Sequence, residues 1–224
     1  MDFEKYILSI KNICQAFGQQ EVLKNVSLDI LPGKIYLIKG RSGCGKSTLL
    51  NICSLIESPK SGEIIFNGSN VSRLQEKELS RIKKEIGYIF QDYNLFEELS
   101  VFENLYTYLQ LVTDMTKKEC FQRIKSALAA YNMENKMSSK VKLLSGGERQ
   151  RVTIIRTLLT KKKIIFADEP SANIDEVNIN IMRQAFLKEK EEGVATVIVT
   201  HDTVFDNIAD FVYRIEQGVL VCKD

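Results

Sequence analysis

The 224-residue sequence predicts an α/β fold that is interrupted by a helical insert. Two observations carry this prediction: apolar runs of strand length alternate with helical periods, and several of these runs end in residues suited to phosphate chemistry. Residues 1–90 are rich in strand patterns, with Val26, Leu28 and Ile30 alternating and further apolar runs at 63–68 and 86–90. After Gln91 the period changes to that of helices.

The helical insert is expected at about residues 91–159, between two parts of a sheet-rich core at 1–90 and about 160–224. One helical face recurs at three to four residues and is expected to be buried; it comprises Phe121, Ile124, Leu128 and Tyr131. The three lysines at 161–163 are interpreted as a solvated turn before the core resumes at Ile164. A closing hairpin is expected at 212–221 with its turn at 216–218.

The strongest single motif lies at residues 40–48, between a strand at 35–38 and a helix. It has the glycine spacing of a P-loop, in which backbone N–H groups surround phosphates. Lys46 would reach the outer phosphates and the Ser47 hydroxyl could bind Mg²⁺. The candidate phosphate-binding residues are Gly40, Arg41, Ser42, Gly43, Cys44, Gly45, Lys46, Ser47 and Thr48.

A second candidate phosphate site begins at Leu144. Ser145 and Glu148 have the spacing of a capping box, so a helix should start here and run to Leu159. Gly146 and Gly147 would let an anion approach the unpaired N–H groups at the positive end of that helix. A capped helix without a ligand is the alternative for this segment alone.

Two acidic residues follow the apolar run at 164–167. Asp168 at the strand end would hold Mg²⁺ through water, and Glu169 would polarise the attacking water at the γ-phosphate. The alternative is a solvated acidic turn.

The single histidine, His201, also follows a strand pattern, at 196–200. A lone histidine is usually structural. Here, however, Gly40, Gln91, Asp168 and His201 each follow a predicted strand, and the carboxyl ends of parallel strands form the edge where such sheets bind ligands.

Composition narrows the class of protein. The 31 basic and 29 acidic residues give a net charge of +2, so no broad basic surface points to nucleic acid. No apolar run approaches the 18 residues of a membrane span, and the N-terminus lacks the pattern of a signal peptide. The five cysteines form no metal-binding spacing, which suits a reducing compartment. We therefore expect a cytoplasmic protein.

In this order, the motifs resemble those of the ATP-binding subunit of ATP-binding cassette (ABC) transporters, over nearly the whole chain. The matching features are Phe17 as the adenine-stacking aromatic, 40–48 as Walker A, Gln91 as the Q-loop, 144–150 as the signature, 164–169 as Walker B, Asp175 as the D-loop and His201 as the switch histidine. Packing of Phe17 in the core is the alternative for that residue.

The resemblance implies an ABC-type P-loop ATPase core, a mixed sheet with flanking helices plus an antiparallel β-subdomain, with an inserted α-helical subdomain. It implies Mg²⁺ with ATP, held by Ser47, Gln91 and Asp168, and hydrolysis by Glu169, His201 and Gln91. The signature would act on the ATP of a partner subunit through Leu144, Ser145, Gly146, Gly147, Glu148 and Gln150.

The resemblance further implies a head-to-tail dimer with a second ABC ATPase subunit, a homodimer in the simplest case. The dimer would power a separate integral membrane permease from the inner face of the cell membrane. Segments 90–95 and 169–175 look most like exporter or extractor ATPases for peptides, lipids or drug-like substrates, although Ser171-Ala172 and Ile174 depart from their usual D-loop. The alternatives are an ABC ATPase that regulates a membrane partner without transport, in cell-wall or division control, and a DNA-repair ATPase, which would need a long coiled coil.

Overall fold

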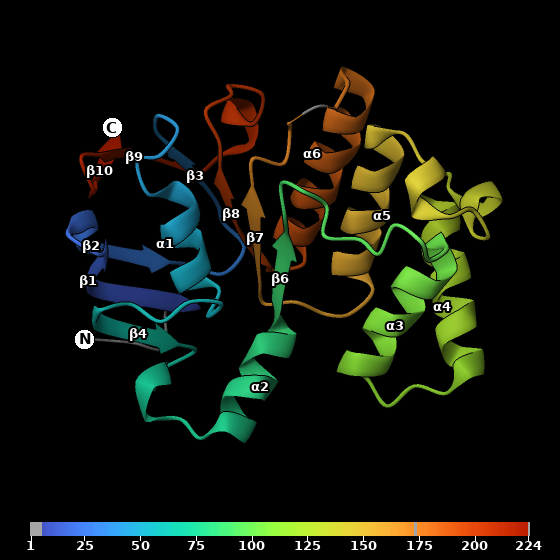
Figure 1. Ribbon diagram of the computed structural model, residues 1–224, viewed down its shortest axis with the longest axis horizontal. Helices are drawn as coiled ribbons and strands as arrows, with labels where there is room; N and C mark the ends of the chain where they lie inside the picture. The colour runs from blue at the N-terminus through green and yellow to red at the C-terminus, as the bar shows by residue number, and fades with distance from the viewer. Residues whose placement is uncertain (1–5, 173, 224) are drawn as a thin grey trace.

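The computed structural model describes residues 6–172 and 174–223, so both ends of the predicted 1–224 domain lie outside the description. Figure 1 shows two β-sheets on one side of the molecule and a group of helices on the other. The strands are β1 (Leu8–Phe17), β2 (Gln20–Ile30), β3 (Ile35–Lys39), β4 (Ser61–Phe66), β5 (Ser69–Asn70), β6 (Ile86–Ile89), β7 (Ile164–Asp168), β8 (Ala195–Val199), β9 (Phe211–Glu216) and β10 (Val219–Lys223). The α-helices are α1 (Lys46–Cys53), α2 (Glu76–Glu85), α3 (Val101–Val112), α4 (Lys117–Ala130), α5 (Gly146–Leu158) and α6 (Glu176–Glu191), and short 3-10 turns occupy Val71–Arg73, Glu134–Lys136, Val141–Leu143 and Asp206–Ile208.

The central sheet has the strand order β10-β9-β3-β8-β7-β6. Strands β9, β3, β8, β7 and β6 are parallel, and β10 closes the edge as an antiparallel hairpin with β9, as the sequence predicts. Both faces of the sheet are buried, because alternate residues of β3 enter different clusters: Tyr36 and Ile38 on one face, Ile35 and Leu37 on the other. The mixed α/β fold is therefore confirmed.

The first face of the central sheet packs against α1 and against an antiparallel sheet of order β2-β1-β4-β5. In β2 the predicted alternation holds, because Val26, Leu28 and Ile30 are all buried. Helix α1 lies between the two sheets and contributes Leu49, Leu50 and Ile52 to this cluster. The helix that begins in the P-loop is thus fixed by apolar packing on more than one side.

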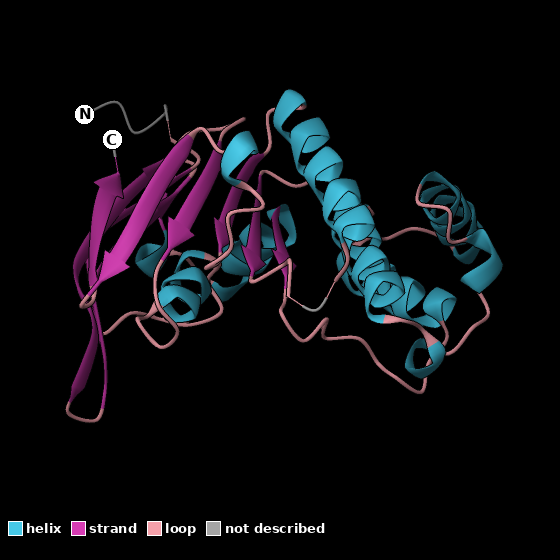
Figure 2. Cartoon of the chain, turned by 90° about the horizontal axis from the view of Figure 1, so that it is seen from above, coloured by secondary structure: helices cyan, strands magenta, loops and turns pink. Residues whose placement is uncertain are grey.

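The second face of the central sheet carries α5 and α6, and Figures 1 and 2 show a further pair of helices, α3 and α4, beyond them and away from the strands. Helix α5 contributes to two clusters: Ile154 packs towards the sheet, while Ile155 packs against α3 and α4. Because neighbouring positions on a helix point in different directions, one helix can join two cores. Helix α5 therefore packs against the central sheet on one side and against α3 and α4 on the other.

Three details differ from the sequence-based expectations. Residues 76–85 form helix α2 within the half expected to be strand-rich. Phe121 is 38% exposed because Cys120, not Phe121, faces inward with Ile124 and Leu128. Lys162 is buried rather than solvated: its ammonium donates to the Lys84 carbonyl and to the Tyr108 hydroxyl, each at 2.8 Å.

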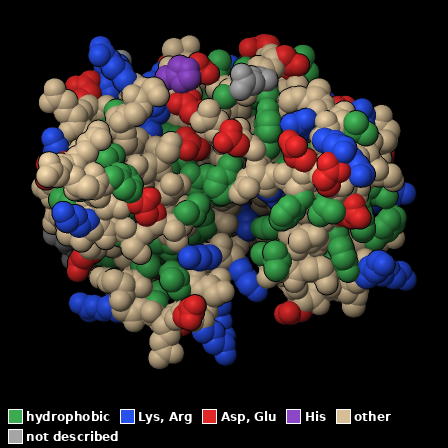
Figure 3. All heavy atoms as spheres, viewed as in Figure 1, with side chains coloured by type: hydrophobic (Ala, Val, Ile, Leu, Met, Phe, Trp, Pro, Cys, Tyr) green, Lys and Arg blue, Asp and Glu red, His purple; other side chains and the backbone are tan. Residues whose placement is uncertain are grey.

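A groove separates the strand-bearing side of the molecule from the helical side, and Figure 3 shows hydrophobic side chains on both sides of a hollow there. This lateral groove has a volume of 330 Å³, and its lining includes Tyr88, Phe90, Phe96, Tyr108, Leu111 and Arg156. Among the described residues, no helix is both long enough and apolar enough to cross a membrane.

Candidate nucleotide site

The predicted site residues that follow strands lie along one edge of the central sheet. Strands β3, β8, β7 and β6 are neighbours and run parallel, so their carboxyl ends meet at that edge. Gly40 follows β3, Gln91 follows β6, Asp168 ends β7 and His201 follows β8. Gln91 is exposed, and within the described part of the chain its side chain forms no hydrogen bond.

The P-loop is held in shape by a glycine that no other residue could replace without strain. Gly45 has a left-handed backbone (φ 103°), and a Cβ atom there would lie 2.9 Å from Cγ1 of Val22. The loop curls around Lys46, which is buried and donates to the Gly40 carbonyl at 2.9 Å and the Arg41 carbonyl at 3.1 Å. Within 6–172 and 174–223 no side chain caps α1, so its first N–H groups remain available to an anion.

Glu169 joins the two sides of the site. One carboxylate oxygen lies 3.5 Å from the Lys46 ammonium, and the other lies 3.0 Å from Nδ1 of His201. The Glu169 backbone is left-handed (φ 42°), which is uncommon for a residue other than glycine. Its N–H donates to the Val199 carbonyl at 2.9 Å, so strand β8 fixes both Glu169 and the nearby His201.

Asp168 offers oxygen atoms that suit a hard cation. Burial raises the pKa of its carboxyl group, and a hydrogen bond with the Ser47 hydroxyl opposes this shift. Its Oδ1 atom is buried and has no hydrogen-bond partner among the residues that the structure describes. A carboxylate and a hydroxyl beside a phosphate-binding loop are the protein ligands that Mg²⁺ takes in nucleotide sites. The residues present therefore fit a magnesium ion.

The predicted capping box at the start of α5 is confirmed. The Ser145 hydroxyl accepts from the Glu148 N–H at 3.3 Å, and the Glu148 carboxylate accepts from the Ser145 N–H at 2.9 Å. Lys136 lies 2.8 Å from the same carboxylate, and this ion pair is the largest cause that lowers the Glu148 pKa. The glycines at 146 and 147 follow directly, in the first turn of the helix.

The candidate signature and the candidate D-loop lie side by side. The Gln150 side chain is buried and donates to the Pro170 carbonyl at 3.1 Å. Asp175 caps α6 by accepting from the backbone and side-chain N–H groups of Asn178, and the backbone bond is the largest cause that lowers the Asp175 pKa. Helices α1 and α5 lie on opposite sides of the central sheet, as their separate clusters and Figure 1 show. One chain thus keeps its two candidate phosphate sites apart.

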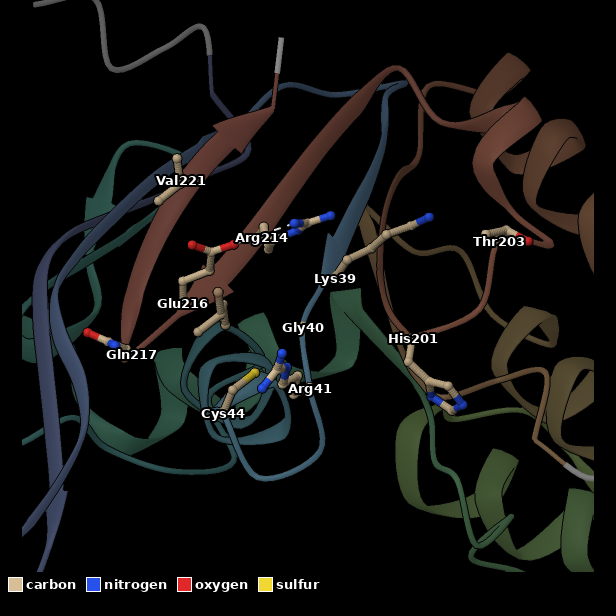
Figure 4. A pocket seen from close by; sticks show the side chains of 11 residues that line it. Lys39, Gly40, Arg41, Cys44, His201, Thr203, Arg214, Glu216, Gln217 and Val221 are labelled. Atoms are coloured by element: carbon tan, nitrogen blue, oxygen red, sulfur yellow. Dashed lines mark hydrogen bonds and ion pairs between the residues drawn. The ribbon is translucent and has the colours of Figure 1, made fainter.

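Beside the P-loop lies a large open pocket of 1010 Å³. Figure 4 shows Arg41 and Cys44 on one side of it, His201 on another and the C-terminal hairpin opposite. Phe17 does not line this pocket; it ends β1 at a hairpin and is 54% exposed. Core packing, the alternative for Phe17, is therefore wrong.

Several contacts in the site could not be found from local sequence patterns. The Ser171 hydroxyl donates to Oδ2 of Asp202 at 2.6 Å, and Oδ1 of Asp202 lies 3.6 Å from Nε2 of His201. Arg156 of α5 donates to the carbonyls of Tyr93 at 2.9 Å and Asn94 at 2.5 Å, just after Gln91. The only signal for Ser171 is its departure from the usual D-loop residue.

The fold and this site define a P-loop ATPase. The profile of the ABC transporter family matches residues 23–172. The lipoprotein-releasing system ATP-binding protein LolD of Bacteroides fragilis is 36% identical over 217 residues, which cover 96% of this chain and 100% of the relative. The macrolide export ATP-binding/permease protein MacB of Campylobacter jejuni is 37% identical over 96% of this chain but only 34% of its own length.

Solved structures agree. The dimeric structure of the bacterial ABC transporter cassette MJ0796 has a TM-score of 0.88 and 32% identity, covering 95% of this chain and 96% of that chain. A dimeric post-hydrolysis state of the same cassette with ADP and phosphate has a TM-score of 0.89 and 31% identity, covering 97% and 98% of the two chains. The chain belongs to the ABC transporter family, and it is an ABC-type ATPase.

Proposed function

We propose that two copies of this chain bind head to tail and enclose two ATP molecules, each between the P-loop of one copy and the signature of the other. The observation that carries this proposal is that each chain holds two phosphate-type helix N-termini, at α1 and α5, that face different sites. The dimeric state of the MJ0796 cassette supports it.

In this dimer the P-loop residues 40–48 bind the phosphates, and Phe17 stacks on adenine. Lys46 exchanges its contacts with two loop carbonyls and Glu169 for contacts with phosphate oxygens. Glu169, released from Lys46, orients and deprotonates the attacking water, and His201 contacts the γ-phosphate. Leu144, Ser145, Gly146, Gly147, Glu148 and Gln150 act on the ATP of the other copy, with Asp175 beside them.

Ser47 and Asp168 are proposed to hold Mg²⁺, with Gln91 joining when nucleotide binds. Two observations support this assignment: the Oδ1 atom of Asp168 is unpaired in the part of the chain that the structure describes, and the Asp168 carboxyl group forms a hydrogen bond with the Ser47 side chain. When bound, the ion neutralises phosphate charge.

We also propose that residues 1–90 and about 160–224 act as the ATPase core and about 91–159 as a helical subdomain. A separate apolar cluster from α3, α4 and one face of α5 supports this division. Since α5 also packs against the core through Ile154, the two parts would move about this helix.

The membrane partner is proposed to be a permease that docks at the lateral groove and the loop at 92–99. Phe96 and Leu111 support this, because they are 63% and 74% exposed at the groove rather than packed in a core. The names of the relatives, a lipoprotein-releasing ATPase and a macrolide export protein, favour export or extraction of a peptide, lipid or drug-like substrate, with this chain at the inner face of the cell membrane.

Size-exclusion chromatography of Glu169→Gln tests the ATPase assignment. An amide can hold water but cannot take its proton, so turnover should fall on the order of 10²- to 10⁴-fold while MgATP binding persists. The variant should elute as a dimer with MgATP and as a monomer without it, and Lys46→Ala should stay monomeric in both. Normal turnover by Glu169→Gln would place the base elsewhere, and a monomer with MgATP bound would contradict the dimer.

Purification from detergent-solubilised membranes of the source cell tests the partner. The tagged chain should recover an integral membrane protein, and Phe96→Ser should release it. Val219→Ser is the matched control, because Val219 is an exposed apolar residue (44%) on the distant hairpin. Equal recovery with both variants would exclude the groove as the docking surface.

A further inference from the structure

A hydrogen bond links the lateral groove to the P-loop helix. The Tyr88 hydroxyl donates to Oδ1 of Asn51 at 2.9 Å. Tyr88 belongs to β6 and lines the groove, whereas Asn51 belongs to α1, which begins at Lys46 in the P-loop. This hydrogen bond therefore joins the docking side of the molecule to the nucleotide side.

Helical spacing puts Asn51 in line with the proposed magnesium ligand of the same helix. Asn51 follows Ser47 by four residues, so both side chains lie on one face of α1. That face meets two adjacent strands: Ser47 bonds to Asp168 at the end of β7, and Asn51 bonds to Tyr88 in β6. The two contacts are one helical turn apart, so a rigid shift of α1 would act on both.

Electrostatics connect the same two places. Burial raises the pKa of Tyr88 above its usual range, and the negative charge of Asp168 raises it further. The phenol therefore stays protonated and remains a donor to Asn51 near neutral pH. The carboxylate proposed to face the metal is therefore close enough to act on the Tyr88 hydroxyl.

On the groove side, Tyr88 stacks on Phe90 with ring centroids 4.0 Å apart. Phe90 lines the groove and directly precedes Gln91. The orientation of the Tyr88 ring thus helps to set both the wall of the groove and the start of the Gln91 loop.

We infer that Tyr88 and Asn51 are positioning residues that carry the state of the nucleotide site to the lateral groove through α1. This inference rests on the proposed function, because it takes MgATP as the ligand of the P-loop. Nucleotide binding would change the contacts of Ser47 and Asp168. A ligand shifts a conformation only when its contacts differ between two states, and this change of contacts would supply that difference for the residues of the groove.

A single tryptophan gives a direct measurement, because the chain contains none. Phe96→Trp places an aromatic reporter in the groove, where Asn104 fixes the backbone at position 96 from both sides. The emission of Trp at 96 is recorded with and without MgATP, and nucleotide binding is measured separately by displacement of mant-ATP. The expected result is a change of emission with MgATP that is lost when Tyr88→Phe or Asn51→Ala is added.

Two comparisons separate coupling from general damage. Tyr36→Phe is the control, because Tyr36 is another tyrosine of the central sheet whose hydroxyl takes part in a hydrogen bond: it accepts from the Leu31 N–H at 2.9 Å. It should keep the response of the reporter. The double variant Tyr88→Phe with Asn51→Ala should lose no more than either single variant, as expected for two partners of one bond.

The outcomes are distinct. If Tyr88→Phe binds mant-ATP and keeps the full MgATP response, or if the reporter never responds although MgATP binds, the inference is wrong while the proposed function stands. If MgATP fails to displace mant-ATP from the parent chain, the proposed function itself fails. Loss of the response in Tyr88→Phe and Asn51→Ala, with nucleotide affinity and the Tyr36→Phe response unchanged, supports the inference.

Discussion

The side chain of Asn178 packs against Gly147 so closely that a Cβ atom on Gly147 would lie 2.1 Å from Nδ2 of Asn178. Asn178 is buried and its Nδ2 is held by Asp175 at 2.8 Å, so the side chain cannot simply turn away. This contact fixes the candidate signature against the start of α6.

Gly147→Ala should therefore destabilise the fold, by about 1–3 kcal/mol for an overpacked site, although alanine favours helices. Adding Asn178→Ala removes the obstructing amide and should restore part of the loss. Urea unfolding of the parent, both single variants and the double variant measures the coupling. Strictly additive effects would show that Asn178 does not restrict position 147.

His201→Ala should lower maximal turnover far more than nucleotide affinity. The proposed contact is to the γ-phosphate, and loss of one electrostatic contact in a reaction typically costs about 10²- to 10³-fold. Steady-state kinetics together with mant-ATP binding separate the two effects. Asp206→Asn is a suitable control, since Asp206 pairs with Lys39 near the same edge of the sheet. Weak binding with normal maximal turnover would contradict the assignment.

Cys44 should react with maleimide in the free protein and be protected by MgATP. Its thiol is partly buried against Gly40 but lines the pocket beside the P-loop. Peptide mapping has internal standards, because Cys222 is exposed while Cys53 and Cys120 are buried. Equal labelling of Cys44 with and without MgATP, or no labelling in either sample, would show that nucleotide does not cover the thiol.

Asp168→Asn should stabilise the nucleotide-free chain at neutral pH while weakening its response to Mg²⁺. The charge is desolvated and one oxygen lacks a partner, so its removal should gain about 1 kcal/mol, a low figure because the residue is only half-buried. Thermal unfolding at several pH values measures this gain.

The pH dependence of Asp168 has a defined sign. Because burial raises its folded pKa, the folded state binds the proton more tightly than the unfolded state. The Asp168 carboxyl group therefore favours folding most below the pKa that it has in the unfolded chain. This contribution is lost as the pH rises from that pKa through the higher pKa of the folded state. The stability gain of Asp168→Asn should therefore grow over that interval and then level off, and a gain independent of pH would rule out this carboxyl as its source.

The parts of the fold with local signals could be predicted. The strand, glycine loop and helix around Lys46 and the capping box at Ser145 each occupy a few consecutive residues, so the sequence specifies them directly. The position of Gly40, Asp168 and His201 at one edge of the sheet could also be predicted, because the carboxyl ends of parallel strands lie at the same edge.

The missed features depend on residues distant in sequence. Lys162 is buried because Tyr108 and the Lys84 carbonyl bind its ammonium, and neither is near it in the chain. The hydrogen bond between Ser171 and Asp202 likewise spans 31 positions. Helix α2 was missed because its apolar face is narrow: Leu79 and Ile82 pack against the core but are only partly buried, and the helix begins where the Glu78 carboxylate accepts from the Gln75 N–H.

The left-handed backbone at Glu169 places stability and catalysis in conflict, because the residue proposed as the base is strained in this conformation. Such a conformation costs on the order of 1 kcal/mol for a residue with a Cβ atom, and glycine would adopt it freely. A chain selected for thermal stability alone would drift towards glycine here and lose its proposed base. The buried strands on either side must therefore supply enough cohesion to tolerate the strain, so variants that loosen β7 or β8 should impair the reaction before they unfold the protein.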